Sequence, residues 1–345
     1  MFYKYPDIEN SYQEELIEKI KRAGYGCIQY IIMEKIHGSN TQIDYNYITG
    51  EFAFGKRSGL LEESETFYNL QSMLTEELKS SMRCLAEMMQ CDLIEYGLSL
   101  STVKFYGEIF GGSYPHEDVP KDKDAIKVQK AVFYSPSNHW MAFDVAFTVY
   151  GTDKVFFLSG SKFWTLCILA GIPTVPILTV ADTLVQALAY PNDGLSKVYE
   201  KYGLPPIEDN VMEGVVIRPY NKDVWLGNTR VILKNKNQKF SEKKNAKKEL
   251  PSEDVPARVL QAREEISQFI TYNRVHNVIS HIGEVTPKDI GKVIQLTTAD
   301  TLKDYNKEFH TLCFLDKKEE KMVTKFLAQE VGKIVRDVVI FGKDS

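Results

Sequence analysis

The amine of Lys35 is the side chain in this sequence best placed for covalent chemistry. It follows an apolar, strand-like run at residues 28–33 and begins a Lys-x-x-Gly frame that ends at Gly38. The frame lies within the sequence Glu34-Lys35-Ile36-His37-Gly38-Ser39-Asn40. A neutral lysine amine can attack the α-phosphate of a nucleoside triphosphate, expel pyrophosphate and hold the nucleotide covalently. Because so short a frame also occurs by chance, it predicts this chemistry only in company with other residues.

Four further groups of charged residues follow, each beside a strand-like segment, in the order that a nucleotidyl-transferring site needs. They are Lys56-Arg57, Gly107-Glu108, Glu213-Gly214 and Lys234-x-Lys236. The last two lysines are two residues apart on a strand, so both point to one face and repel each other unless an anion lies between them. Each group alone is commonly a solvated strand end, but the ordered set predicts a site for a triphosphate or a nucleic-acid phosphate.

Two carboxylates and an apolar slot complete the candidate site. Glu108 can accept hydrogen bonds from ribose hydroxyls or hold a metal-bound water, and Glu213 can organise a divalent cation. Phe143 can stack on a purine, a contact worth roughly 1–3 kcal/mol per base, with Val216 as the second wall. The ordinary alternatives are strand ends before turns for the carboxylates and core packing for Phe143.

The elements that must position these residues change character along the chain. Up to about residue 240, strand-like segments alternate irregularly with a few helical patterns, which predicts an α+β fold with mainly antiparallel sheets. The first helix is expected from Ser11 to Ala23, with Ser11 and Glu14 as a capping box. Beyond residue 253 the pattern is helical, with Thr286-Pro287 as a helix start and one apolar face formed by Val275, Val278, Ile279 and Ile282. The predicted domains are residues 1–243, which carry the chemistry, a basic linker at 244–252 and a helical domain at 253–345.

Composition limits the class of protein. The chain has 345 residues, of which 43% are apolar and 26% charged, as in soluble globular proteins. It has no run of 18 apolar residues and no signal-peptide pattern at its start, and its five cysteines are scattered without metal-ligand spacing. An intracellular protein with reduced thiols and no membrane partner is therefore expected. The net charge of −5 argues against a general nucleic-acid coat, while the lysine-rich stretch at 234–248 is either a solvated linker or a phosphate-binding strand that runs into a basic hinge.

Taken in order, these five motifs resemble those of the covalent nucleotidyltransferase superfamily, which includes ATP-dependent polynucleotide ligases and mRNA-capping enzymes. The sequence around Lys35, with His37 where many members have aspartate, is similar to the RNA ligase 2 family of bacteriophage double-stranded-RNA ligases and kinetoplastid RNA-editing ligases. Residues 239–244, 273–280 and 287–289 resemble the bacteriophage branch. The resemblance implies an antiparallel-sheet, ATP-grasp-like adenylation domain followed by a small all-helical C-terminal domain.

The resemblance also implies a role for each candidate residue. Lys35 would be the adenylylated nucleophile, and the other catalytic residues would be Glu213, Lys234 and Lys236. Glu213 would also bind the metal, with Glu108 contributing through water. The nucleotide would be bound by Glu34, Ile36, His37, Asn40, Arg57, Glu108, Phe143 and Val216. The nucleic acid would be contacted by Lys56, Arg218, Lys243, Lys244, Arg274 and Asp300.

The reaction implied by the resemblance is ATP-dependent sealing of a 3′-hydroxyl to a 5′-phosphate through lysyl-AMP, with Mg²⁺ or Mn²⁺ as the metal. The expected partner is nicked duplex RNA, the expected state a monomer, and the expected location the cytoplasm, including that of an infected host cell. Two alternatives remain open. A capping-type guanylyltransferase would use GTP and carry a strand-rich domain after the last lysine motif, and an inactive nucleic-acid-binding protein would keep the scaffold without ATP turnover.

Overall fold

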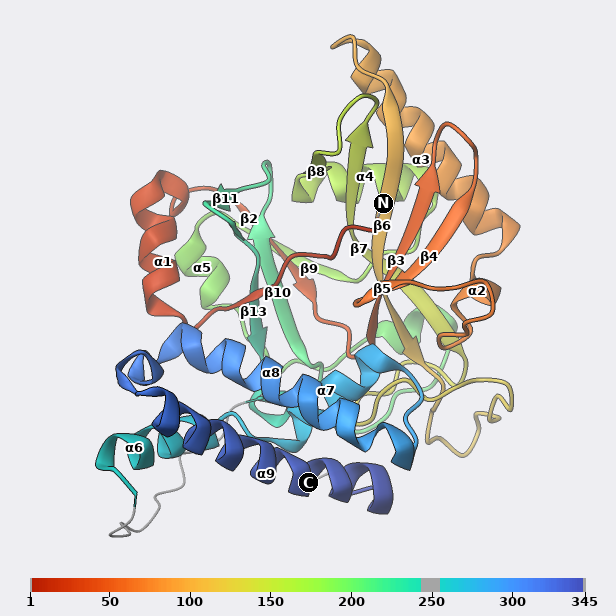
Figure 1. The fold of residues 1–345 in the computed structure, drawn as a ribbon. Coiled ribbons are helices and arrows are strands. Elements are labelled where there is room, and N and C mark those ends of the chain that lie inside the picture. The colour runs from red at the N-terminus through yellow and green to blue at the C-terminus, as the bar shows by residue number, and fades with distance from the viewer. Residues whose placement is uncertain (1, 243–254, 344–345) are drawn as a thin grey trace. The chain divides into compact units, whose positions relative to one another are not determined.

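The computed structural model describes residues 2–242 and 255–343 (Figure 1). These residues form two compact units that divide between Asn237 and Gln238. The first unit contains two larger sheets with surrounding helices, and the described part of the second is helical. The expected α+β fold with mainly antiparallel sheets and a helical C-terminal part is confirmed. The expected basic linker at 244–252, and with it Lys243 and Lys244, lies outside the described residues.

A five-stranded sheet carries the segments around Lys35 and Glu213. Its strand order is β1-β13-β10-β2-β9, with β1 parallel to β13 and the other neighbours antiparallel. The strands are β1 (Glu9–Asn10), β2 (Tyr30–Glu34), β9 (Ile177–Ala181), β10 (Gly214–Pro219) and β13 (Leu233–Lys236). One face, which includes Ile32 and Val215, packs on α1 (Glu14–Ile20) and α5 (Leu184–Leu188) (Figure 1). The opposite face is therefore left for the site.

A six-stranded sheet carries Asn40, Glu108 and Phe143. Its order is β5-β4-β3-β6-β7-β8. The strands are β3 (Ser39–Asn46), β4 (Phe52–Lys56), β5 (Gly59–Leu60), β6 (Leu100–Gly111), β7 (Asn138–Val149) and β8 (Val155–Phe157). The remaining helices and strands of the first unit are α2 (Leu70–Met73), α3 (Glu76–Ile94), α4 (Gly160–Ala170), β11 (Trp225–Leu226) and β12 (Thr229–Arg230), with a short 3-10 helix at Val198–Tyr202.

The start of the first helix differs from the sequence prediction. Helix α1 begins at Glu14 after Gln13, which makes no side-chain cap, so the expected capping box of Ser11 and Glu14 is wrong. The backbone N–H of Ser11 instead donates to the carbonyl of Lys234 at 3.0 Å, because the preceding residues extend β1 along β13. Pairing with the sheet thus takes Ser11 away from the helix end, and α1 continues into a wider turn at Lys21–Tyr25.

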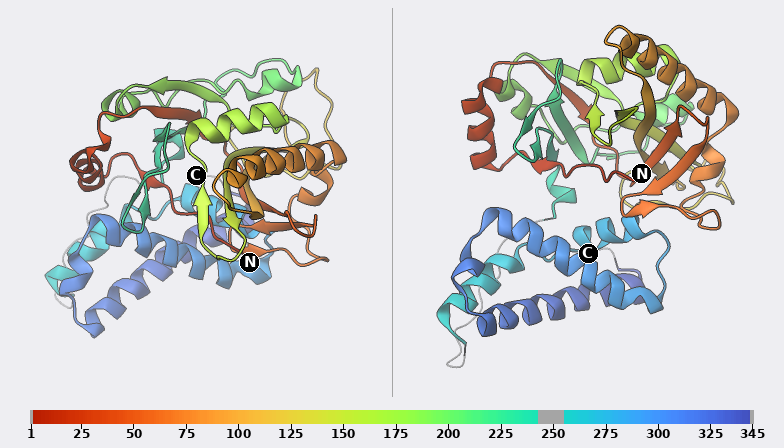
Figure 2. Two further views of the ribbon diagram at one scale, coloured as in Figure 1. Left: turned by 90° about the horizontal axis from the view of Figure 1, so that it is seen from above. Right: turned by 45° about the horizontal axis from the view of Figure 1, so that its top comes forward.

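The second unit is a bundle of helices (Figure 2). The longer ones are α6 (Ala257–Ser267), α7 (Tyr272–Ile282), α8 (Ile290–Glu308) and α9 (Lys317–Phe341), with 3-10 turns at Gln238–Phe240, Pro287–Asp289 and Thr311–Phe314. The predicted apolar face of α7 is confirmed, since Val275 lies in the core with Ile279 and Ile282 packed against it. Thr286 is the N-cap of the following turn with Pro287 next to it, as predicted, and it also forms a capping box with Asp289. Among the described residues, none of the helices is both long and apolar enough to cross a membrane.

Candidate active site

The register of the five-stranded sheet gathers the predicted lysines on one face. Val216 of β10 lies opposite Met33 of β2 and Lys234 of β13, and residues opposite each other in an antiparallel pair share a face. Lys35 follows Met33 by two residues, and its backbone N–H donates to the carbonyl of Gly214 at 2.9 Å, which continues the ladder. Because side chains alternate along a strand, Lys35 lies on the face of Val216 and Lys234.

A buried carboxylate joins the ends of these strands. Glu213 is 2% exposed, and its Oε2 lies 2.7 Å from Nζ of Lys35 and 3.4 Å from Nδ1 of His37. Its other oxygen, Oε1, lies 2.9 Å from Nζ of Lys236. The carboxylate therefore lies between two ammonium groups and fixes the position of both. Three of the predicted motifs meet at this one side chain.

The surroundings of Glu213 keep it ionised. Burial acts to raise the pKa of its carboxyl group, but the neighbouring charges of Lys236 and Lys35 outweigh burial. The pKa of Glu213 consequently lies well below its usual range. Glu213 is therefore the negative charge that faces the two lysines.

The six-stranded sheet contributes Glu108 and Asn40 as a directly opposed pair on β6 and β3. Partial burial, with the negative charge of Glu213 nearby, raises the pKa of Glu108 to about 8 against the opposing effect of Lys35. The backbone N–H of Gly38 is a donor to the Glu108 carboxyl group. A Cβ at Gly38 would lie 2.0 Å from the carbonyl oxygen of Ile109, so only glycine allows the Lys35 loop to approach β6 this closely.

A β-bulge in β7 turns Phe143 toward the same region. Tyr106 pairs with Asp144 and Gly107 with Ala142, which leaves Phe143 as the extra residue. The ring of Phe143 lies 5.0 Å, centroid to centroid, from that of Tyr5 in an edge-to-face contact. Phe143 and Val216 both flank the small apolar cluster that includes Tyr5. The two predicted walls of the base pocket, one from each sheet, thus pack against the same cluster.

The predicted contact of Arg218 with nucleic acid is corrected by the burial of its side chain. Its side chain is 2% exposed, with Nη1 2.8 Å from Oδ1 of Asp144 and Nη2 donating to the carbonyl of Leu158 at 2.6 Å. Arg230 approaches the other oxygen of Asp144 at 2.5 Å. Arg218 lies on the face of Val216, but there it meets the strand that carries Asp144 and is enclosed. It serves the structure of the first unit and is not exposed to a polynucleotide.

Lys56 and Arg57 are separated by the alternation of β4. Lys56 lies opposite Thr41, so it is on the face away from Asn40, where it pairs with Glu65. Arg57 comes one residue later, and its Nη2 lies 2.8 Å from Oδ1 of Asp7. The structure therefore places Arg57, and not Lys56, on the side of Glu108. The positive charge of Arg57 opposes the effect of burial, which raises the pKa of Glu108.

Glu34 and Ile36 flank Lys35 but have buried side chains, at 3% exposure each. Glu34 lies opposite Val215, so its carboxyl group is on the face away from Val216. Oε1 of Glu34 has no hydrogen-bond partner among the described residues. Burial, opposed by a hydrogen bond to Ser196, raises the pKa of Glu34 to about 7. Among the described residues we observe no side-chain contact between Glu34 or Ile36 and the charged groups of Lys35, Glu213 and Lys236. The predicted role of Glu34 and Ile36 in nucleotide binding stays a prediction.

The raised pKa of Glu34 gives a prediction about stability. An unfolded glutamate has a pKa of about 4.3, so the folded chain binds the proton more strongly between that value and the folded pKa. The free energy of unfolding should therefore fall as the pH rises from about 5 to about 7, by the linkage of one proton. In Glu34→Gln this component should disappear. Urea denaturation of both proteins across this range measures it, and parallel pH profiles would contradict the assignment.

In the second unit the structure brings Arg274 and Asp300 together. Arg274 is 1% exposed, and its guanidinium contacts Asp300, lies 3.0 Å from Asp304 and 3.8 Å from Glu242. The prediction that Arg274 itself contacts nucleic acid is corrected, because burial and carboxylates enclose its charge. Asp300 is partly exposed and is the more accessible member of the pair.

Sequence reasoning missed several residues of the site. Asp7 and Tyr5 come from the segment before β1, and Tyr134 comes from the connection between β6 and β7, where its hydroxyl accepts the backbone N–H of His37 at 2.8 Å. Neither segment has a recognisable motif. Only their position in three dimensions identifies them.

Comparison with known proteins gives two family matches and several relatives. The model described as RNA ligase matches residues 28–236, and the model described as T4 RNA ligase 2 C-terminal matches residues 253–333. The mitochondrial RNA-editing ligase 1 of Trypanosoma brucei brucei is 26% identical over 362 residues, which cover 87% of this chain and 74% of that protein. The mitochondrial RNA-editing ligase 2 of the same organism is 32% identical over 161 residues, 43% of this chain and 37% of that protein.

A solved structure of a Naegleria gruberi RNA ligase mutant in its apo form resembles the chain with a TM-score of 0.41 and 18% sequence identity. The match covers 69% of this chain and 56% of the solved chain. Another mutant of the same ligase, solved with ATP and Mn, gives a TM-score of 0.40 at 17% identity over 69% of this chain and 57% of that one. The chain thus spans little more than half the length of these solved chains.

Proposed function

Since this chain belongs to the RNA ligase family and is an RNA ligase, we propose that it uses ATP to seal a 3′-hydroxyl to a 5′-phosphate at nicks in duplex RNA, through a lysyl-AMP at Lys35. The observation that carries the proposal is the contact of Lys35 with Glu213, which Lys236 shares. A buried carboxylate between two lysines holds the nucleophile in place and keeps the charge of Lys236 beside it.

In the first step Nζ of Lys35 attacks the α-phosphorus of ATP after losing a proton. A P–N bond forms, and the bond from the α-phosphorus to the leaving pyrophosphate breaks. Lys236 and Lys234 lie on one face of β13, the face of Val216, where their charges stabilise the negative charge that develops on the phosphate oxygens. Glu213 orients both Lys35 and Lys236 for this step.

In the second step a 5′-phosphate oxygen of the RNA attacks the phosphorus of the AMP on Lys35. A P–O bond forms, the P–N bond breaks, the Lys35 amine is released, and AMP is carried by the RNA 5′-phosphate. In the third step the adjacent 3′-hydroxyl oxygen attacks the 5′-phosphorus and loses its proton. The phosphodiester bond forms, the bond from that phosphorus to the oxygen of AMP breaks, and AMP leaves. Arg57 lies on the side of Glu108 and is held by Asp7, so it is the cation we assign to the RNA 5′-phosphate. Asn40, opposite Glu108, completes this polar end of the site.

The residues present fit a divalent cation. Glu108 of β6 and Glu213 beside Lys35 are the two carboxyl groups of the site, and carboxylate oxygens are the ligands that a hard cation prefers. When bound, Mg²⁺ or Mn²⁺ would neutralise phosphate charge. Glu213 and Glu108 would hold it, with Lys35 and Lys236 retained beside them.

The base pocket and the second unit favour a ligase over a capping enzyme. Phe143 and Val216 form two apolar walls that suit a purine of either kind. A capping-type guanylyltransferase was expected to have strands after the last lysine motif, whereas the described residues after Lys236 form only helical elements. We assign this helical unit, with Asp300 at its surface, to holding duplex RNA during sealing.

The test is labelling with ATP that carries a radioactive α-phosphate. The protein is first treated with pyrophosphate to remove any bound AMP, then incubated with labelled ATP and Mg²⁺, denatured, and the labelled peptide is sequenced. Label on Lys35, none on Lys35→Ala and none from GTP would support the proposal. An unlabelled wild-type protein that still binds nicked RNA would replace it with the inactive binding protein. Nicked RNA and nicked DNA duplexes, supplied next, test which kind of nicked duplex the protein seals.

A further inference from the structure

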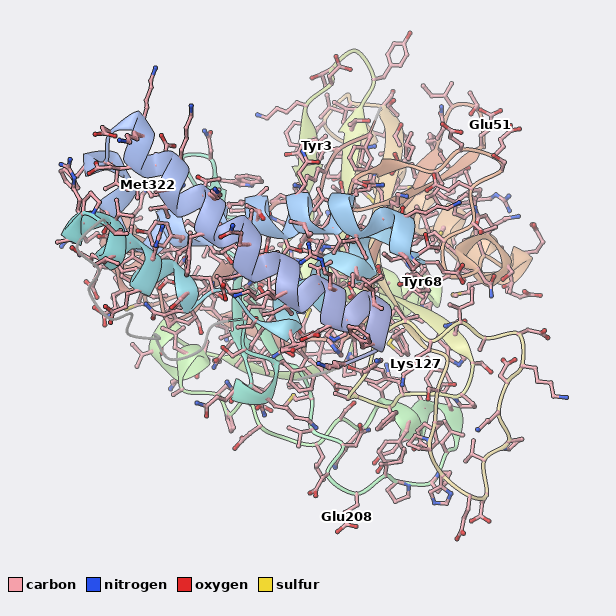
Figure 3. The ribbon with its side chains drawn as sticks, turned by 60° about the horizontal axis from the view of Figure 1, so that its bottom comes forward. Tyr3, Glu51, Tyr68, Lys127, Glu208 and Met322 are labelled. Atoms are coloured by element: carbon pink, nitrogen blue, oxygen red, sulfur yellow. The ribbon has the colours of Figure 1, made fainter. Side chains whose placement is uncertain are left out.

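The connection between β6 and β7, residues 112–137, reaches the loop that carries Lys35. Figure 3 shows this connection as an irregular stretch of chain, with Lys127 labelled on it. The hydroxyl of Tyr134 accepts the backbone N–H of His37 at 2.8 Å, and Nε2 of Gln129 donates to the carbonyl of Gly38 at 3.3 Å. Both contacts are to the backbone two and three residues after the nucleophile.

Tyr134 is rigidly placed for this contact. Its side chain is 1% exposed, and its ring packs edge-to-face on Phe110 of β6 with 5.2 Å between centroids. Burial raises the pKa of Tyr134 well above its usual range, so the hydroxyl stays neutral and can accept a hydrogen bond. A tyrosine needed only to fill the core would not have to direct its oxygen at a backbone amide of the active-site loop.

A second residue, Asn210, fixes the chain next to Tyr134. Its Oδ1 accepts the backbone N–H of Phe133 at 2.9 Å, and its Nδ2 donates to the carbonyl of Phe133 at 2.7 Å. Asn210 is 3% exposed and lies three residues before Glu213. The two ends of this chain of contacts are therefore the Glu213 segment and the Lys35 loop, whose side chains form the catalytic ion pair.

The backbone at Ala131 is a further sign of constraint. Its φ angle is 78°, in the left-handed region that residues with a Cβ rarely adopt. Such a conformation persists where contacts on both sides hold it. On the N-terminal side of Ala131, Gln129 donates a hydrogen bond to the carbonyl of Gly38. On the C-terminal side, Tyr134 accepts a hydrogen bond from the backbone N–H of His37.

We propose that Tyr134 is a positioning residue for Lys35, and that Asn210 holds Tyr134 in register with the Glu213 segment. The inference rests on the proposed function, because it assigns Tyr134 to the adenylylation step. The hydrogen bond from His37 fixes the backbone of the loop, and a displacement of about 1 Å at a reacting group can lower a rate about 100-fold.

The test compares Tyr134→Phe with Tyr114→Phe. Phenylalanine at 134 keeps the ring packing and removes only the acceptor for His37. Tyr114 is a buried tyrosine in the same connection, and its hydroxyl donates to the carbonyl of Pro205, remote in sequence from Lys35. We expect the rate of enzyme–AMP formation at saturating ATP to fall about 10- to 100-fold in Tyr134→Phe and less than about twofold in Tyr114→Phe. The KM for ATP should change little in either.

Asn210→Ala should lower the same rate, and the double variant with Tyr134→Phe should lose less than the product of the two effects, because both act through one contact. A wild-type rate in Tyr134→Phe would overturn the inference, as would equal losses of rate and of melting temperature in Tyr134→Phe and Tyr114→Phe. The proposed function fails separately, if the wild-type protein itself takes no label from ATP.

Discussion

Replacing Glu213 with glutamine is expected to lower the rate of enzyme–AMP formation by about 100- to 1,000-fold, a loss typical of removing one preorganised charge from an active site. Glutamine has the size of glutamate but no charge. Its amide nitrogen would face Nζ of Lys35 or of Lys236, now 2.7 and 2.9 Å from the carboxylate oxygens, and two donors repel each other at that distance. The two ammonium groups would also lose the charge that holds them near each other.

The pH dependence of stability gives an independent measure of the same residue. The pKa of Glu213 is depressed in the folded state, so its stabilising contribution is present above the unfolded value of about 4.3 and is lost as the pH falls through the folded pKa. Glu213→Gln lacks this titration and should show a shallower loss of stability in acid. Glu213→Asp is the matched control, because it keeps the charge but is one methylene too short to reach both lysines. An unchanged labelling rate in Glu213→Gln would remove Glu213 from the mechanism.

Much of the site could be predicted because its motifs stand at the ends of strands. Register then brings strand ends together, and Lys35, Glu213 and Lys236 meet as the sequence indicated. The resemblance to RNA ligase 2 is confirmed by the family matches to both parts of the chain. The order of the motifs predicts the site because each motif is short and local, while all of them must contact the same substrate.

The errors and omissions arose where a residue's role depends on long-range packing. Arg218 lies on β10, whose alternation is visible in the sequence. The strand that carries Asp144 is remote in sequence, so the burial of Arg218 against Asp144 was not predictable. Lys56 was grouped with Arg57, although neighbours on a strand point to opposite faces. Tyr134 stands in a long irregular connection without periodicity, and no local signal marks the hydrogen bond from His37.

The buried network around Asp144 gives the second large prediction. Asp144 is fully buried, Tyr5 donates to its Oδ2 at 2.8 Å, and Arg218 and Arg230 approach its two oxygens at 2.8 and 2.5 Å. Burial acts to raise the pKa of Asp144, but the two guanidinium groups outweigh burial and lower it. The carboxylate therefore links β7 of one sheet to β10 of the other and to the β12 hairpin strand.

Asp144→Asn should destabilise the first unit by about 3–5 kcal/mol, because the buried guanidinium of Arg218 would lose its counter-ion and that of Arg230 would keep only Asp223. A folded domain is typically stable by only about 5–15 kcal/mol, so a large fall in the melting temperature is expected. The control is Asp92→Asn, which breaks the half-exposed pair with Lys162, 2.5 Å apart, and should change stability by less than about 1 kcal/mol. Adding Arg218→Met to Asp144→Asn should recover part of the loss, since it removes one unpaired charge. Equal stability of the Asp144 and Asp92 variants in denaturant titrations would show that the network is not what joins the two sheets.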